Sequence, residues 1–265
     1  MKSERPVMTF IRHPDDTRSD RIELFSSGGE VHVVKSPVRV RILSMLRERE
    51  MGFDEIVARS ARAKSTISVH LKELAGEGIL DARPDPLDSR KKIFSLRPGY
   101  LGSLSADDRI DEDLGGFVLA ALEREADPSS VFKAFFQAIR LSLMREGVMV
   151  DPILYSAGSS VGRALSGLVN APDIETLLMN LCAFWGERGL GRLEVVSRDP
   201  LTLDIYDCYE CQGLPQLGKP VCAFDAGILA ALFEAHSRDE WVVTETKCYA
   251  MNDACCRFVV LPRAE

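Results

Sequence analysis

The cysteines are the residues of this chain best suited to chemistry, and all of them lie in its last third. They are Cys182, Cys208, Cys211, Cys222, Cys248, Cys255 and Cys256. Cys208 and Cys211 have the C-x-x-C spacing that favours a lowered thiol pKa and disulfide formation, and that also suits metal binding. Glu245 stands in an otherwise apolar strand-like run, where a carboxylate needs a partner. The group predicts a metal site or a redox switch, against the alternative of small buried hydrophobes.

The composition is that of an ordinary globular protein, with 46% hydrophobic and 28% charged residues. No apolar run approaches the length of a membrane span, and the start MKSERPVMTFIRHPDD lacks the apolar core of a signal peptide. We therefore expect a cytoplasmic protein that makes no use of a membrane. Cysteines stay reduced in that compartment, so clustered thiols indicate metal binding or redox chemistry rather than structural disulfides.

The net charge of −7 is unevenly distributed along the chain. Residues 1–100 contain 19 Lys and Arg against 15 Asp and Glu, whereas the remainder contains 14 against 25. A basic amino-terminal module on an acidic body is the pattern expected when one domain alone contacts nucleic acid.

Residues 36–98 predict three short helices followed by a basic hairpin, which is the order of a winged helix-turn-helix. Ser36 is the expected N-cap of the first helix, with Pro37 at its first position. The third helix buries Ile67, Leu71 and Leu74. Its other face and the hairpin then present the side chains expected to contact DNA bases and phosphates, namely Lys64, Ser65, Thr66, Ser68, His70, Lys72, Arg90, Lys91 and Lys92. The alternative is a small helical subdomain with a solvated charged face.

The stretch STISVHLKELAGEGIL…DSRKKIFSL resembles the winged-helix domain of ArsR- and MarR-type prokaryotic regulators. That resemblance implies a homodimer bound to a two-fold-symmetric, double-stranded DNA operator. Residues 1–35 are interpreted as an amino-terminal extension, and residues 99–127 as a linker and helix, with the domain boundary near 98–115.

Residues 128–265 predict an α+β domain in which helices pack on an antiparallel sheet. The order is helices, two strands, a helix and two further strands. An apolar stripe on the helix near 128–146 indicates core or dimer interface, and comprises Val131, Phe132, Phe135, Phe136, Ile139 and Leu143. Small residues such as Gly158 and Gly162 in the next helix permit close helix packing. No Gly-rich phosphate loop or nucleophile elbow is present in the sequence, so we do not expect an enzyme.

The segment DCYECQGLPQLGKPVCAFDAGILAALF…WVVTETKCYAMNDACCRFVV resembles the 4-vinyl reductase domain, a small-molecule-binding module. In several members of that family three cysteines and a glutamate hold a structural zinc ion. The matching residues here, at the same intervals, are Cys222, Glu245, Cys248 and Cys256. The resemblance therefore implies a closed tetrahedral Zn²⁺ site.

The fusion of a winged helix to this domain, with surplus cysteines, resembles the archaeal methanogen-specific redox regulators (the MsvR family). That resemblance implies a repressor that binds DNA when reduced and senses oxidation through the remaining thiols, Cys208, Cys211, Cys182 and Cys255. Two alternatives stay open. One is a regulator that responds to an aromatic or apolar effector, with a purely structural zinc ion. The other is an enzyme or tetrapyrrole-handling protein with a DNA-binding appendage.

Overall fold

The computed structural model describes residues 21–263 except 98, 107–108, 125–127 and 170, so residues 1–20 of the expected extension lie outside it. The chain forms two compact units. Unit 1 runs to Asp108 and also includes Gly147–Met149, whereas unit 2 comprises Arg109–Glu146 and the chain from Val150. The division after Asp108 falls within the range 98–115 in which the sequence places the linker.

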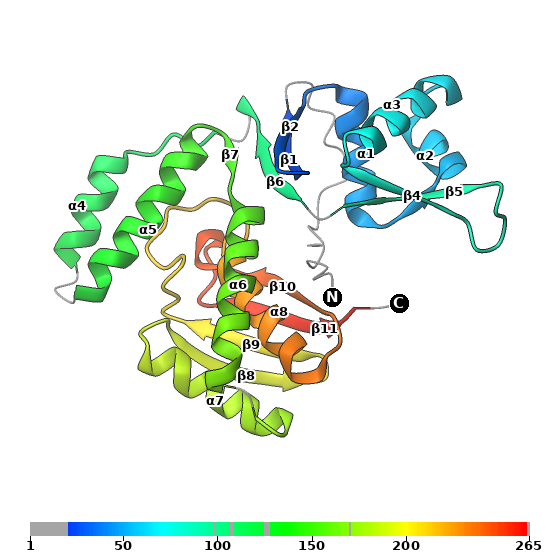
Figure 1. Cartoon of the computed structure of the whole chain (residues 1–265). Helices are drawn as coiled ribbons and strands as arrows, with labels where there is room; N and C mark the ends of the chain where they lie inside the picture. The colour runs from blue at the N-terminus through cyan, green and yellow to red at the C-terminus, as the bar shows by residue number, and fades with distance from the viewer. Residues whose placement is uncertain (1–20, 98, 107–108, 125–127, 170, 264–265) are drawn as a thin grey trace. The chain divides into compact units, whose positions relative to one another are not determined.

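Unit 1 contains the winged helix (Figure 1). Its elements are α1 (Pro37–Glu48), α2 (Phe53–Ser60), α3 (Lys64–Gly76), β4 (Leu80–Pro84) and β5 (Lys92–Leu96). The short strand β3 (Met51–Gly52) pairs with β5, which gives the antiparallel order β3-β5-β4. Ser36 is the N-cap residue of α1 and Pro37 its first helical residue, because proline has no N–H to leave unpaired there.

The core of the winged helix follows from the apolar period of its three helices. Ile67, Leu71 and Leu74 of α3 are buried, as are Ile42 and Leu43 of α1. Their burial leaves the opposite face of α3 to solvent and so determines which side chains can reach a partner.

A second sheet in unit 1 was not expected from the sequence. Its strands are β1 (Ile22–Ser27), β2 (Glu30–Val34), β6 (Tyr100–Leu104) and β7 (Val148–Met149), in the order β2-β1-β6-β7. The regions interpreted as extension and linker therefore contribute three of these strands. In β1 the alternation of apolar and polar residues that would predict a strand is interrupted, because the inward residue Glu23 is charged. Glu23 is fully buried and accepts a hydrogen bond from the Arg47 guanidinium at 2.5 Å.

Unit 2 has the α+β architecture that the sequence predicts. Its helices are α4 (Leu114–Arg124), α5 (Pro128–Arg145), α6 (Asp151–Val169), α7 (Ile174–Glu187) and α8 (Ala223–Ser237). Its strands are β8 (Arg192–Arg198), β9 (Leu201–Tyr206), β10 (Trp241–Lys247) and β11 (Cys256–Pro262), antiparallel throughout in the order β10-β11-β9-β8. Helix α5 begins at Pro128, the first residue of the domain that the sequence predicts.

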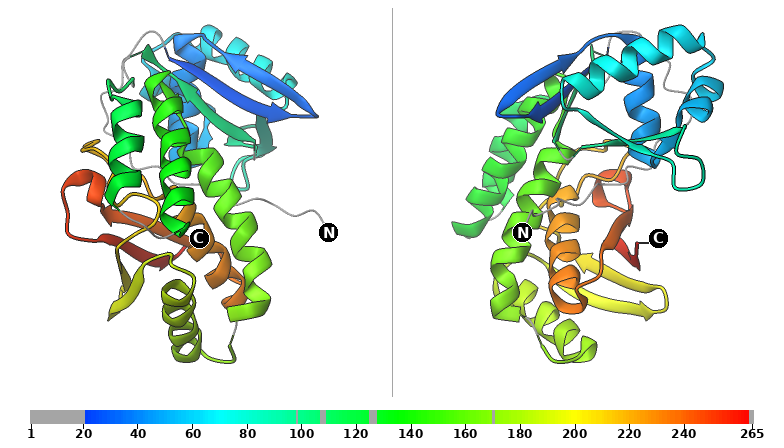
Figure 2. Two further views of the ribbon diagram at one scale, coloured as in Figure 1. Left: turned by 90° about the vertical axis from the view of Figure 1, so that its left-hand side faces the viewer. Right: turned by 45° about the vertical axis from the view of Figure 1, so that its right-hand side comes forward.

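Helices α6 and α8 lie side by side at very short range (Figures 1 and 2). A Cβ atom added at Gly158 would lie 2.1 Å from the carbonyl oxygen of Phe224, and one at Gly162 would lie 2.5 Å from that of Ile228. The prediction that small residues of α6 permit close packing is confirmed. This packing positions the amino-terminal end of α8, where Cys222 lies.

Candidate metal centre and nucleic-acid interface

Five cysteines of unit 2 converge on one buried point. Cys208 and Cys211 belong to the segment between β9 and α8 (residues 207–222), which we call the cysteine loop. Cys222 is the N-cap residue of α8, Cys248 follows β10, and Cys256 begins β11. All five side chains are fully buried. The antiparallel pairing of β9, β10 and β11 thus joins positions that are up to 48 residues apart in the sequence.

The sulfur atoms lie at separations typical of ligands around one metal ion. Cys222 Sγ lies 3.7 Å from Cys208 Sγ, 3.9 Å from Cys248 Sγ and 3.6 Å from Cys256 Sγ. A shorter separation, 3.1 Å, joins Cys211 Sγ and Cys256 Sγ. Around a tetrahedral zinc ion with bonds of about 2.3 Å, neighbouring sulfurs lie about 3.8 Å apart.

Two sets of four donors meet the geometric requirement of a metal site. In each set all donor atoms lie within 4.8 Å of one another. One set is the quartet expected from the 4-vinyl reductase resemblance, Cys222, Glu245, Cys248 and Cys256. The other consists of cysteines alone, Cys208, Cys211, Cys222 and Cys256. Buried side chains are thus positioned to hold a metal ion in either set.

Glu245 has one oxygen atom available to a cation. Its Oε2 accepts a hydrogen bond from the backbone N–H of Cys222 at 2.8 Å. Its Oε1 is buried and has no hydrogen-bond partner among the described residues. Burial raises the pKa of this carboxyl well above its usual range, because the ionised form loses its water. A bound cation would remove that penalty, so the residues present fit a metal ion.

A second layer of buried charge lies behind the cysteines, and the sequence pattern did not reveal it. Arg140 of α5 forms an ion pair with Glu210, which stands between Cys208 and Cys211 in the loop. Glu210 also accepts the backbone N–H groups of Phe224 at 3.1 Å and Asp225 at 3.0 Å, and so caps α8. Two features of the sequence could have indicated this ion pair: an arginine within the apolar stripe of α5, and a glutamate inside the C-x-x-C motif.

Arg140 and Gln137 hold the cysteine loop in place from α5. The Arg140 guanidinium also donates to the carbonyl oxygen of Val221. Gln137 Nε2 donates to the carbonyl oxygens of Tyr209 at 3.3 Å and Gln212 at 3.1 Å. These contacts fix the loop backbone between the two cysteines and after them.

The four cysteines expected to sense oxidation do not gather in one place. Cys208 and Cys211 join the buried group, whereas Cys182 on α7 and Cys255 before β11 belong to neither four-donor set among the described residues. Burial raises the pKa of the Cys182 thiol, and burial together with Asp204 raises the pKa of the Cys255 thiol. Cys208 and Cys211 are the two of these four thiols that the fold brings beside one another and beside the other buried cysteines.

The side chains expected to contact DNA lie mostly on the solvent side of α3 and on the β4–β5 hairpin, which we call the wing. The exposed members are Lys64, Ser65, Thr66, Ser68, Lys72, Arg90, Lys91 and Lys92. His70 is half-buried, with Nδ1 3.4 Å from Glu73 Oε2. The exposed hydroxyl and amine groups of α3 therefore lie on its solvent side, together with Val69, which is 55% exposed.

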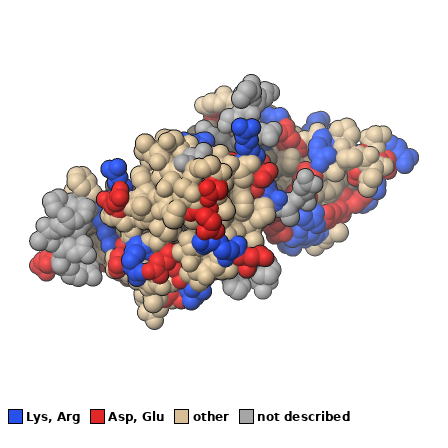
Figure 3. Space-filling model, turned by 90° about the horizontal axis from the view of Figure 1, so that it is seen from below, with Lys and Arg blue, Asp and Glu red and all other residues tan. Residues whose placement is uncertain are grey.

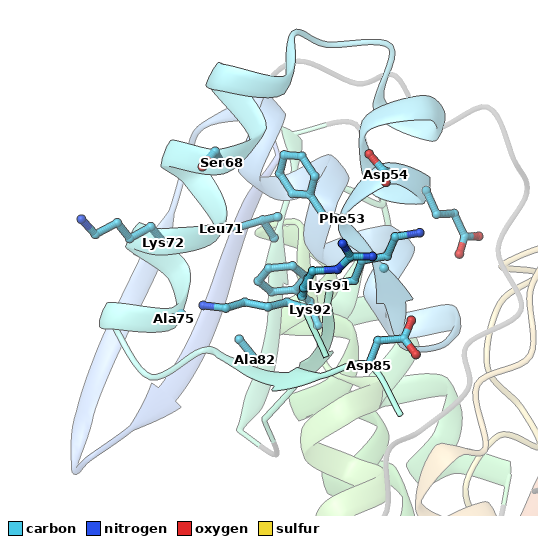
Figure 4. Close-up of a pocket in the computed structure, with 14 residues that line it drawn as sticks. Phe53, Asp54, Ser68, Leu71, Lys72, Ala75, Ala82, Asp85, Lys91 and Lys92 are labelled. Carbon is cyan, nitrogen blue, oxygen red and sulfur yellow. The ribbon is translucent and has the colours of Figure 1, made fainter. Parts of the chain in front are cut away.

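A cavity of about 630 Å³ lies between α3, the wing and the start of α2 (Figure 4). Lys72 from α3 and Lys91 and Lys92 from the wing line it, together with the carboxylates of Asp54 and Asp85. Nearby cations are partly paired within the unit: Lys64 Nζ lies 3.3 Å from Asp54, and Arg90 Nε lies 3.1 Å from Asp88.

Charge of both signs is also mixed elsewhere on the surface. On the face shown in Figure 3, Lys and Arg side chains are interspersed with Asp and Glu. That face therefore shows no general excess of positive charge. No helix among the described residues is long and apolar enough to cross a lipid bilayer.

Comparison with protein families finds two matches, one within each unit. The 4-vinyl reductase domain matches residues 201–262, and the bacterial regulatory protein arsR family matches residues 36–82. The first match contains the five converging cysteines, and the second contains α1, α2 and α3.

Curated relatives include two uncharacterized proteins of Methanocaldococcus jannaschii. MJ1642 is 33% identical over 129 residues, which are 48% of this chain and 75% of the relative. MJ0150 is 30% identical over 129 residues, which are 48% of this chain and 73% of the relative.

Solved structures that resemble part of this chain include a vinyl-4-reductase family protein of M. jannaschii, at 21% identity and a TM-score of 0.38 over 58% of this chain and 98% of that one. The phenol-responsive sensory domain of the transcription activator PoxR matches at 13% identity and a TM-score of 0.43, over 58% and 92%. On its family matches and curated relatives, the chain belongs to the 4-vinyl reductase domain family and joins that domain to an ArsR-type helix-turn-helix, the architecture of a DNA-binding transcription regulator.

Proposed function

We propose that this protein is a redox-responsive transcriptional repressor that binds operator DNA as a reduced homodimer and carries a structural zinc ion in unit 2. The observation that carries the proposal is the convergence of five buried cysteines and Glu245 at the start of α8, in a chain with an ArsR-type helix-turn-helix. Because such a regulator acts on DNA, we place it in the cytoplasm and propose no enzymatic activity for it.

The zinc ion is assigned to Cys222, Glu245, Cys248 and Cys256. Three thiolates and one carboxylate are suitable zinc ligands, and the spare oxygen of Glu245 supports the assignment. The ion would link the start of α8 to the hairpin of β10 and β11. Its binding energy would then contribute to the stability of unit 2.

Oxidation is assigned to Cys208 and Cys211, whose sulfurs lie within 4.8 Å of each other. A peroxide removes two electrons and two protons from the two thiols, the sulfurs join, and the O–O bond of the peroxide breaks to give water. Formation of an S–S bond of about 2.05 Å must draw the two sulfurs together and so move the loop backbone around Glu210.

The route from this loop to the DNA-binding unit runs through α5. Displacement of Glu210 disturbs its buried ion pair with Arg140. Helix α5 ends at Arg145, and the chain then enters β7, which pairs with β6 in the sheet of unit 1. A shift of α5 therefore acts on unit 1 through a short covalent connection.

A homodimer is supported by an exposed apolar stripe on α5. Phe132 is 74% exposed, Phe135 51% and Ile139 63%, a spacing that places them along one face of the helix. Such a patch typically marks a protein interface. Two winged helices held about 34 Å apart would match two operator half-sites, and a change in that spacing would weaken binding.

The experiment begins by selecting duplexes from random sequence with the reduced protein, and then measures affinity for them by fluorescence anisotropy. We expect hydrogen peroxide to lower the affinity at least tenfold, and dithiothreitol to restore it. The Cys208→Ser/Cys211→Ser variant should bind with or without peroxide, whereas Cys182→Ser should respond like the wild type.

Two results would contradict the proposal. If wild-type affinity ignores both peroxide and dithiothreitol, the redox function is wrong. If the double variant still releases DNA on mild oxidation, the switch lies in other cysteines. The repressor assignment is checked separately by transcription in vitro from a promoter that overlaps the selected duplex, where the reduced protein should reduce the transcript yield.

A further inference from the structure

The cysteine group of unit 2 offers six donor atoms rather than four, because its two four-donor sets overlap only in Cys222 and Cys256. We propose that the group holds two metal ions at once, as a binuclear thiolate cluster in which both shared sulfurs bridge the ions. The terminal ligands are Cys208 and Cys211 on one ion, and Glu245 and Cys248 on the other. This inference rests on the metal-binding part of the proposed function and adds a second ion to it.

Three of the sulfur separations fit two tetrahedra that share an edge, whereas the fourth, 3.1 Å between Cys211 Sγ and Cys256 Sγ, is shorter than a tetrahedral edge. The shared edge, from Cys222 Sγ to Cys256 Sγ, measures 3.6 Å. Cys222 Sγ lies 3.7 Å from Cys208 Sγ in one set and 3.9 Å from Cys248 Sγ in the other. With metal–sulfur bonds of about 2.3 Å, ions on opposite sides of that edge would lie about 3 Å apart. A thiolate sulfur has enough lone pairs to bind both.

The balance of charge permits the second ion. One divalent ion with three thiolates and one carboxylate leaves a buried excess of two negative charges. Binding the second ion displaces the protons of Cys208 and Cys211, so two positive charges arrive and two depart. The net charge of the buried site is therefore unchanged, and the second ion adds no uncompensated charge to a region where that is costly.

The loop that supplies the second pair of terminal ligands is held in place before any metal binds. Gln137 and Arg140 of α5 donate to loop carbonyl groups between Cys208 and Cys211 and after Cys211. Glu210, between the two cysteines, is fixed by the backbone N–H groups of α8. Both thiols are fully buried and face the ligands of the first ion. A pre-positioned pair of donors loses little conformational entropy on binding.

Outer contacts orient one terminal ligand and one of the bridging residues. The backbone N–H of Cys248 donates to Asp253 at 2.9 Å, and that of Cys222 donates to Glu245. Such second contacts are usual around metal sites, where they fix the direction of each ligand.

The test counts metal ions in full-length protein purified under reducing conditions and loaded with Zn²⁺, by native mass spectrometry and elemental analysis. We expect two ions per chain in the wild type, one in Cys208→Ser/Cys211→Ser, and two in the control Cys182→Ser. Replacement by ¹¹³Cd²⁺ should give two NMR resonances split by coupling between the two cadmium nuclei, because the bridging sulfurs connect them. Peroxide should release one ion per chain to a chromogenic chelator.

The outcomes separate this inference from the proposed function. One ion per chain in both the wild type and the double variant overturns the cluster and leaves the single zinc site standing. No ion in either overturns both. Two cadmium resonances without mutual coupling overturn the shared-sulfur arrangement. If the double variant does not fold, the wild-type stoichiometry and the cadmium coupling decide the matter.

Discussion

Arg140 of α5 and Glu210 of the cysteine loop form an ion pair whose side chains are 2% and 0% exposed. Burial raises the pKa of Glu210, and the Arg140 guanidinium opposes that shift. Each charge is therefore stabilised by its partner rather than by water. Glu210 also caps α8, at the helix end that carries Cys222. The pair therefore joins α5 to the cysteine group.

Removing one partner of this pair should be costly. Arg140→Met should lower the free energy of unfolding of unit 2 by about 3–5 kcal/mol, because it leaves Glu210 buried without its counter-ion. Urea denaturation followed by circular dichroism measures the change. Adding Glu210→Gln to Arg140→Met should recover part of the loss, whereas Arg145→Ala, at the exposed end of α5, should change stability by less than about 0.5 kcal/mol. Equal losses in Arg140→Met and Arg145→Ala would contradict the argument.

Metal removal should destabilise unit 2 selectively. The ligands come from the cysteine loop, α8 and the β10–β11 hairpin, so chelation removes the ion that links these segments through their thiols and Glu245. Differential scanning calorimetry should show a lower transition temperature for unit 2 after treatment with a strong chelator, and Cys248→Ser should reproduce the shift. The transition of the winged helix should stay in place. An unchanged thermogram in metal-free protein would remove the structural role of the ion.

The wing should contribute affinity without sequence preference. Lys91→Ala/Lys92→Ala should weaken binding to all duplexes and reduce the slope of log affinity against log salt by about one for each phosphate that is no longer neutralised. Arg163→Ala removes the same kind of charge from the exposed face of α6 and should have no effect. Fluorescence anisotropy over a range of salt concentrations gives both quantities. An unaltered slope in the double variant would indicate that the wing lies off the DNA.

The polar face of α3 should instead determine sequence preference. Ser65→Ala should change which duplexes are selected, with losses of about 1–3 kcal/mol at one or two base pairs and little change in salt dependence. His70→Ala should have a smaller effect than Ser65→Ala, because the imidazole is half-buried against Glu73. Selection from random duplexes followed by sequencing compares the variants. Identical preferences in the wild type and Ser65→Ala would place base recognition elsewhere.

The glycines of α6 offer a test of helix packing with an internal control. Gly158→Ala places a Cβ 2.1 Å from the carbonyl oxygen of Phe224, so α8 must shift; we expect a loss of about 1–3 kcal/mol or more. Gly167→Ala lies on the same helix, where a Cβ meets no described heavy atom within 4 Å beyond its own helix and chain neighbours. That change should be neutral or stabilising by up to about 1 kcal/mol. Similar unfolding midpoints for the two variants would contradict the close approach of α6 and α8.

Much of the molecule follows from local sequence pattern alone. The three helices and wing of residues 36–98, the helices of unit 2 and its antiparallel strands were predictable, because apolar period, N-cap residues and turn residues act over a few positions. The quartet of Cys222, Glu245, Cys248 and Cys256 came from a family resemblance, and the structure brings it together.

The tertiary structure alone decided three features. Strands β1, β2 and β6 were missed because none has a continuous apolar inward face: β1 turns Glu23 inward onto Arg47, β2 leaves Val31 and Val33 exposed, and β6 buries Gly102 and Ser103. The entry of Cys208 and Cys211 into the metal-ligand group, and the exclusion of Cys182 and Cys255, depend on how β9, β11 and α8 meet. The contact of Arg140 with Glu210 joins residues 70 positions apart. Such pairings arise from long-range packing, on which sequence spacing carries no information.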